Sequence, residues 1–258
     1  MYKRKHTDLP VWESVPFHSV ILLENSDFDK NELIKNLVAD WNLSIHDESD
    51  DKDFLMFRKD RMVVSVKLVA EPFDQTTIEN YASTNFFWED AMDVAVNHKV
   101  YLAVVVLPTD KGAVDASILD SQVNASTLSL DNAIGISVVG TVYDPIFYRD
   151  AAYRIKENVY PVLMQVYICV YYNERDELSA YTYGLYHFGK LEIEVIDSVL
   201  DPMELFNAIK DIFTELITLG VNFSEGERVD LVDGRIIQAN ISPSPIFGHN
   251  TTKIKYLN

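Results

Sequence analysis

The segment GLYHFGK at residues 184–190 has the spacing of a loop that binds nucleotide phosphates. Such a loop needs Ser or Thr after its lysine to bind magnesium, and a helix whose N-terminal amides face the phosphates. Here Leu191 follows Lys190, and the next residues alternate in polarity as a strand does. The context therefore argues against nucleotide binding, and the glycines are better explained as positions where a strand bends.

The chain contains one cysteine and six histidines, the residue types most used as nucleophiles and zinc ligands. Cys169 lies in the apolar run VYICVYY, where a thiolate is poorly solvated, so we expect a small core residue. The histidines form no H-x-x-x-H pair, and no C-x-x-C, G-x-S-x-G or G-x-G-x-x-G motif occurs. The sequence thus indicates no catalytic residue, no metal and no cofactor.

Tyrosine is concentrated in one part of the chain, because ten of the fourteen lie within residues 143–186. A long hairpin is expected there, with strands at residues 162–172 and 179–188. Alternation predicts a shared face on each strand, formed by Tyr167 and Tyr171 with Cys169 on the first and by Tyr181, Tyr183 and His187 on the second.

Tyrosine combines a large contact area with a polar tip and is enriched at interfaces. We therefore predict a binding surface on this hairpin, to which Thr84, Asn85 and Trp88 of a preceding helix are added as conspicuous side chains. The alternative is that a helix carrying Tyr148 and Tyr153 covers this face, with the hydroxyls satisfied at the margin of the core.

These side chains are positioned by helices and strands that alternate irregularly along the chain. Capping residues and apolar stripes predict helices at residues 31–41, 77–98, 114–130, 145–157 and 202–219. Further strands are expected at residues 19–24, 101–107 and 136–142, with a hairpin following the first helix. This order favours an α+β fold with mostly antiparallel sheets over a doubly wound parallel one.

The chain lacks a linker rich in Pro, Gly or Ser, so we expect a tail at residues 1–15 and a single domain at residues 16–258. Residues 18–72 and 190–245 follow the same β-α-β-β order when they are aligned with an offset of 172. Either this is a diverged internal duplication, or two well-capped amphipathic helices resemble each other by chance.

Acidic residues outnumber basic ones by 40 to 22, which gives a formal net charge of −18. This charge opposes binding to nucleic acid or to anionic membranes. The longest apolar runs are far shorter than the roughly 20 residues that cross a bilayer. With one cysteine and no signal-peptide pattern, the sequence predicts a cytoplasmic protein of unknown oligomeric state.

Four segments together resemble a known bacterial family, the domain of unknown function 4261. They are TNFFWEDA at 84–91, GTVYDPIFY at 140–148, SAYTYGLYHFGKLEIEV at 179–195 and TKIKY at 252–256. The resemblance runs over residues 15–256 and implies a bacterial cytoplasmic protein, but it supplies no catalytic residues. The chain departs from the family at residues 89–91, where a proline and a glutamate are expected.

Two functions remain open. The first is a non-enzymatic interaction protein that neutralises a basic partner, which the net charge and the missing catalytic set favour. The second is an enzyme or small-ligand receptor with a pocket near the tyrosine-rich hairpin. A deep pocket with converging polar groups favours the second, and a flat acidic face favours the first.

Overall fold

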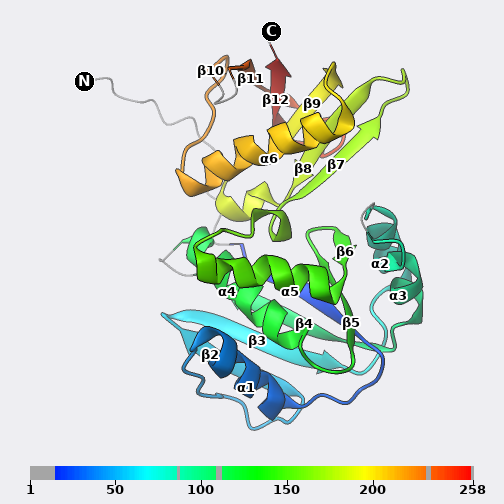
Figure 1. Ribbon diagram of the computed structural model, residues 1–258, viewed down its shortest axis with the longest axis vertical. Helices are drawn as coiled ribbons and strands as arrows, with labels where there is room; N and C mark the ends of the chain where they lie inside the picture. Colours follow the sequence, from blue (N-terminus) through cyan, green and yellow to red (C-terminus); the bar gives the residue numbers. More distant parts are fainter. Residues whose placement is uncertain (1–14, 86–87, 109–111, 231–233, 257–258) are drawn as a thin grey trace.

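The computed structural model describes residues 15–85, 88–108, 112–230 and 234–256, which form six α-helices and two six-stranded sheets (Figure 1). The predicted α+β class with mostly antiparallel sheets is confirmed. Apart from Val15, the predicted tail lies outside the described residues. No helix in the described part of the chain is long and apolar enough to cross a membrane.

The first sheet has the strand order β2-β3-β4-β1-β5-β6, and all its neighbouring strands are antiparallel. Its strands are β1 (Phe17–Leu23), β2 (Phe54–Lys59), β3 (Met62–Val69), β4 (Val100–Leu107), β5 (Ala133–Val138) and β6 (Thr141–Tyr143). One face packs against α1 (Lys30–Trp41), α4 (Ala113–Thr127) and α5 (Pro145–Tyr153), and the other against α2 (Gln75–Ser83) and α3 (Ala91–Asn97). Strand alternation divides the core accordingly, since Ile21 joins the first face and Leu22 the second.

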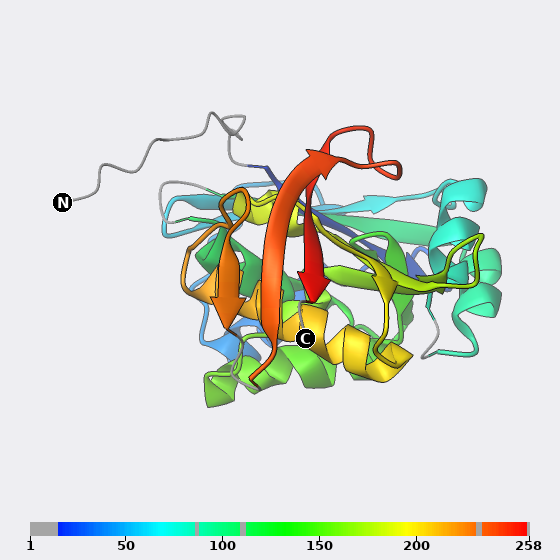
Figure 2. The same ribbon diagram turned by 90° about the horizontal axis from the view of Figure 1, so that it is seen from above.

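The second sheet has the order β10-β11-β12-β9-β8-β7, and only the pair β9–β12 is parallel among the described strands. Its strands are β7 (Tyr167–Tyr172), β8 (Leu178–Tyr183), β9 (Ile193–Ser198), β10 (Arg228–Asp230), β11 (Ile236–Pro243) and β12 (Asn250–Tyr256). Helix α6 (Pro202–Thr218) buries Ile209 and Phe213 against one face. Figure 2 shows α6 on one side of this sheet and the loop between β11 and β12 on the other.

Aspartate caps set the start of three helices, as the sequence predicts. The Asp29 carboxylate accepts hydrogen bonds from the first turn of α1, and Asp144 does the same for α5. Asp201 forms a reciprocal capping box with Glu204 at the start of α6. These caps satisfy amides that have no partner within the helix.

Two predicted elements are wrong in extent. The single helix expected at residues 77–98 is two helices, because α2 ends at Ser83 and α3 starts at Ala91. The predicted hairpin strands are shorter than expected, since residues 162–164 and 185–188 are 3-10 helices. Gly184 ends the second strand, with a φ of 122° that other residues rarely adopt.

The two sheets are joined by a polar cluster beneath α4. The Tyr160 hydroxyl lies 2.7 Å from the Ser117 hydroxyl, and the Gln165 amide donates to the Ser121 hydroxyl over 2.8 Å. The partners come from α4 on one side and from the segment leading into β7 on the other. These bonds fix where the second sheet begins relative to the first.

The segments of the predicted duplication share the order strand, helix, strand, strand, as β1-α1-β2-β3 and β9-α6-β10-β11. They also occupy equivalent places in the two strand orders. One relationship differs, because β1 is antiparallel to its neighbour β4 whereas β9 is parallel to β12. Common ancestry of the two segments remains a prediction.

Candidate functional site

The hairpin β7–β8 gathers tyrosines on the sheet face that lies opposite α6. Tyr167 pairs with Tyr183, and Cys169 pairs with Tyr181, so their side chains share this face. Tyr171 lies on it too, and its ring meets that of Tyr181 edge to face at 5.9 Å. The structure therefore brings together all four tyrosines that were predicted to form the binding surface.

Phe247, in the loop between β11 and β12, packs onto these tyrosines. Its ring stacks against Tyr183 at 6.3 Å and contacts Tyr181 edge to face at 5.5 Å. Local alternation cannot identify Phe247, because it lies more than 60 residues from the hairpin in the sequence. Much of the tyrosine face is thus covered by the chain itself.

A buried ion pair lies on the same face. Lys253 approaches the Glu194 carboxylate to 2.9 Å, and the Thr251 hydroxyl donates to it over 2.7 Å. Burial alone raises the pKa of Glu194, but hydrogen bonds from Lys253, Ser244 and Thr251 together hold it below its ordinary value. The sequence offers no sign of this pair beyond polar residues on two strands.

His187 does not share the face of Tyr181 and Tyr183, so that prediction is wrong. Strand β8 ends at Tyr183, and His187 lies in the following 3-10 helix, where its ring stacks on Phe17 at 4.7 Å. Burial and the nearby His18 lower its pKa to about 4, so the imidazole is neutral at pH 7. His187 packs the two sheets together.

Thr84 and Asn85 reach the junction between the sheets, whereas Trp88 packs into the core beneath α2 and α3. The Tyr167 hydroxyl donates to the Thr84 carbonyl over 3.1 Å, and the Asn85 amide donates to the Val142 carbonyl. Tyr167, Thr84 and Asn85 therefore meet at one place, but Trp88 takes no part in it.

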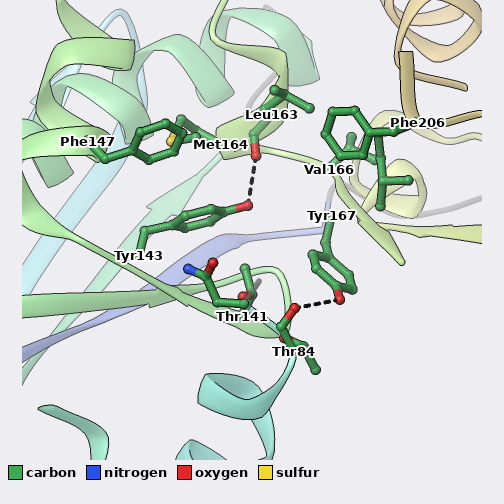
Figure 3. Close-up of a pocket in the computed structure, with 11 residues that line it drawn as sticks. Thr84, Thr141, Tyr143, Phe147, Leu163, Met164, Val166, Tyr167 and Phe206 are labelled. Atoms are coloured by element: carbon green, nitrogen blue, oxygen red, sulfur yellow. Dashed lines mark hydrogen bonds between the residues drawn. The ribbon is translucent and has the colours of Figure 1, made fainter. Parts of the chain in front are cut away.

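A junction pocket opens at this place (Figure 3). Its cavity volume is about 50 Å³. The Tyr143 hydroxyl is engaged with the Leu163 carbonyl at 3.2 Å. The lining is mainly apolar and uncharged, and it consists of Thr84, Asn85, Thr141, Tyr143, Phe147, Leu163, Met164, Val166, Tyr167, Ile168 and Phe206.

A second hollow, the β7–α6 groove, runs beside the outer edge of the second sheet. Its cavity volume is about 230 Å³, and it shares Ile168 and Phe206 with the junction pocket. Two of its side chains are prominent, since Tyr172 is 61% and Met203 57% exposed. Its lining residues are Ile168, Val170, Tyr171, Tyr172, Leu178, Pro202, Met203 and Phe206.

Two exposed carboxylates are sequence neighbours of residues that line the β7–α6 groove. Asp201 and Glu204 flank Pro202 and Met203 at the start of α6. The start of α6 therefore carries negative charge next to residues of the apolar hollow.

Helix α4 contains a buried carboxyl group that the sequence patterns do not single out. Asp120 accepts hydrogen bonds from the Asn124 amide at 3.1 Å and the Gln165 amide at 3.4 Å. Burial raises the pKa of Asp120 to about 7, although these hydrogen bonds oppose the shift. The sequence signal for this site is the number of polar residues in the predicted helix at 114–130, several of which prove to be buried in α4.

Cys169 and Lys190 are the two residues for which the sequence raised a catalytic or phosphate-binding role, and both lie in the second half of the molecule. Cys169 is half-buried on the tyrosine face and not in the core beneath α6, so its predicted core placement is wrong. The buried Lys190 ammonium donates to the Val221 carbonyl over 2.6 Å and to the Asn222 side chain over 3.2 Å. Strand β9 follows Lys190 where a phosphate-binding loop requires a helix.

Comparisons with known proteins connect the C-terminal part of the chain to one family. A search of curated proteins found no match, and a search of solved structures found none either. Within the described residues, no group of three or more His, Cys, Asp or Glu side chains is arranged to hold a metal ion. The family model described as Domain of unknown function (DUF4261) matches residues 181–255, which confirms the family resemblance found in the sequence.

Proposed function

We propose that this chain is a non-enzymatic interaction module that binds a basic segment of another protein in the β7–α6 groove. The observation that carries the proposal is an open apolar groove at the edge of a sheet, with exposed carboxylates next to its lining residues in the sequence. A bacterial, cytoplasmic setting accords with the single cysteine and with the family resemblance. The binding of a basic protein would neutralise that protein's charge.

The edge of the second sheet suits an extended partner segment. Strand β7 is last in the strand order and, among the described strands, pairs only with β8. An edge strand has backbone amides and carbonyls available for another strand. A segment added beside β7 gains main-chain hydrogen bonds, and its alternate side chains point into the groove.

Exposed apolar side chains give such a segment places to anchor. Met203 on α6 and Tyr172 on β7 are exposed groove residues, and Val170 and Phe206 in the same lining are partly exposed. Burying a side chain such as Met203 contributes about 1–2 kcal/mol to binding. Clustered apolar exposure of this kind is typical of interaction sites on proteins.

The charges select the kind of partner. Asp201 and Glu204 flank the groove residues Pro202 and Met203 in the sequence, and the chain as a whole has a formal net charge of −18. Arg175, in the β7–β8 turn, is paired with Glu177 at 3.9 Å. A segment that alternates apolar residues with Lys or Arg complements this surface, and its association should be fast and salt-sensitive.

Three peptides of about ten residues, a length sufficient to pair with a whole strand, test this proposal. In the first, valine alternates with lysine; in the second, valine alternates with glutamate; in the third, serine alternates with lysine. Fluorescence anisotropy should show binding of the first peptide only, weakening as salt is raised.

The side chains that carry binding can be tested with a matched pair of variants. Met203→Gln removes an apolar group from the groove, and we expect a loss of affinity of about tenfold. Leu219→Gln makes the same kind of change at the other end of α6, where Leu219 is 68% exposed, and should have no effect. Equal affinities for all three peptides, or equal effects of the two variants, would contradict the proposal.

A further inference from the structure

We infer that the junction pocket binds a small uncharged molecule with an apolar body and one hydrogen-bonding group. The inference rests on Thr141, which lines the pocket and is 1% exposed. Its hydroxyl oxygen has no hydrogen-bond partner within the described part of the chain. A buried hydroxyl without a partner is costly, and a ligand that supplies one removes this cost.

The other hydroxyl groups of the pocket already donate to the protein. Tyr143 donates to the Leu163 carbonyl and Tyr167 to the Thr84 carbonyl, as the dashed lines in Figure 3 mark. The Thr84 hydroxyl donates to the Tyr81 carbonyl over 2.7 Å. Burial raises the pKa of both phenols well above the ordinary value, so both remain protonated at pH 7. Thr141 is therefore the hydroxyl that is left for a ligand.

The lining determines the rest of the ligand's chemistry. None of the described lining side chains carries a formal charge, so an ion would lose its hydration here without compensation. Apolar side chains such as Met164, Val166 and Ile168 make up most of the wall. The space suits a body of a few carbon atoms.

The pocket also lies between the two halves of the molecule. Thr84, Thr141 and Tyr143 belong to the first sheet and its helices, whereas Val166 and Phe206 belong to the second. A bound molecule contacts both, so it should stabilise their packing and raise Tm.

The test uses three probes with the same four-carbon body, namely 1-butanol, butyrate and butylammonium. NMR titration of the ¹⁵N-labelled protein should show 1-butanol shifting the amide signals of Thr141 and Tyr167 with a saturable dependence on concentration. The two charged probes should leave these signals unchanged. No peptide or partner is present, so the result is independent of the function proposed above.

Variants isolate the role of the hydroxyl. Thr141→Val keeps nearly the same shape and should weaken 1-butanol binding about five- to tenfold, the effect of one hydrogen bond. Thr141→Ser should restore binding. Thr127→Val is the matched control, because the buried Thr127 hydroxyl already donates to the Val123 carbonyl over 2.8 Å. Equal binding of the three probes, no saturable shift with any of them, or undiminished binding by Thr141→Val would overturn the inference.

Discussion

The Tyr167 hydroxyl donates a hydrogen bond to the backbone carbonyl of Thr84 over 3.1 Å, across 83 residues of sequence. Tyr167 is the first residue of β7, the edge strand of the second sheet. Thr84 directly follows α2, a helix that covers the first sheet. This bond closes one side of the junction pocket. It also fixes the start of β7, the strand that forms one wall of the β7–α6 groove.

Tyr167→Phe removes this bond and leaves the rest of the ring in place. We expect the free energy of unfolding to fall by about 1 kcal/mol, because the Thr84 carbonyl loses a partner where Tyr167 is buried. Urea unfolding followed by circular dichroism measures this change. Tyr172→Phe is the control on the same strand, and an equal loss there would refute a specific role for the Tyr167 hydroxyl.

Glu194→Gln tests the buried ion pair on the tyrosine face. The pKa of Glu194 is lowered in the folded protein, so ionised Glu194 stabilises the fold above its unfolded pKa, near 4. This contribution is lost as the pH falls through the folded pKa. The variant should be less stable than wild type by about 1–3 kcal/mol at neutral pH, and the difference should shrink in acid.

The control for Glu194 is Glu215→Gln, at an exposed position on α6. Unfolding by urea should give the same stability for this variant and wild type at each pH. A Glu194→Gln variant whose stability deficit is independent of pH would show that the charge of Glu194 does not stabilise the fold.

Asp120→Asn should have the opposite pH dependence. The folded pKa of Asp120 is raised to about 7, so between about pH 4 and pH 7 the native state holds more protons than the unfolded state. The wild-type protein therefore loses stability as pH rises through this window, whereas asparagine stays neutral. Relative to wild type, the variant should gain on the order of 3 kcal/mol over that range. A constant difference between the two proteins would mean that the pKa of Asp120 is the same in the folded and unfolded states.

Lys190→Met removes the ammonium but keeps most of the aliphatic stem. We expect a loss of about 1–2 kcal/mol in the free energy of unfolding, because the Val221 carbonyl and the Asn222 side chain lose their donor. Calorimetric titration should detect no ATP binding to either protein. Tight ATP binding by wild type that disappears in Lys190→Met would restore the phosphate-loop interpretation.

The elements with strong local signals were predicted well. The caps at Asp29, Asp144 and Asp201, each followed by an apolar stripe, located the starts of α1, α5 and α6. Capping and side-chain periodicity are local properties of a chain, so a single sequence reveals them. The α+β class followed from the order of these elements.

Features that depend on distant contacts were missed. An apolar stripe continued through residues 77–98, but the chain turns between α2 and α3, so the stripe belongs to two helices. Alternation extended the predicted strand to residue 188, but the positive φ of Gly184 ends the strand earlier. Phe247 on the tyrosines and Gln165 beside Asp120 come from remote segments, which no local pattern connects.

The most direct test of the proposed function is amide hydrogen exchange with and without the peptide that alternates valine with lysine. We predict slower exchange in the presence of the peptide at residues 167–172 of β7 and at the start of α6, because an added strand pairs with that edge. The Met203→Gln protein should show much less protection at the same peptide concentration. Protection confined to the loop around Phe247, or to β10 at the opposite edge of the sheet, would contradict the assignment of binding to the β7–α6 groove.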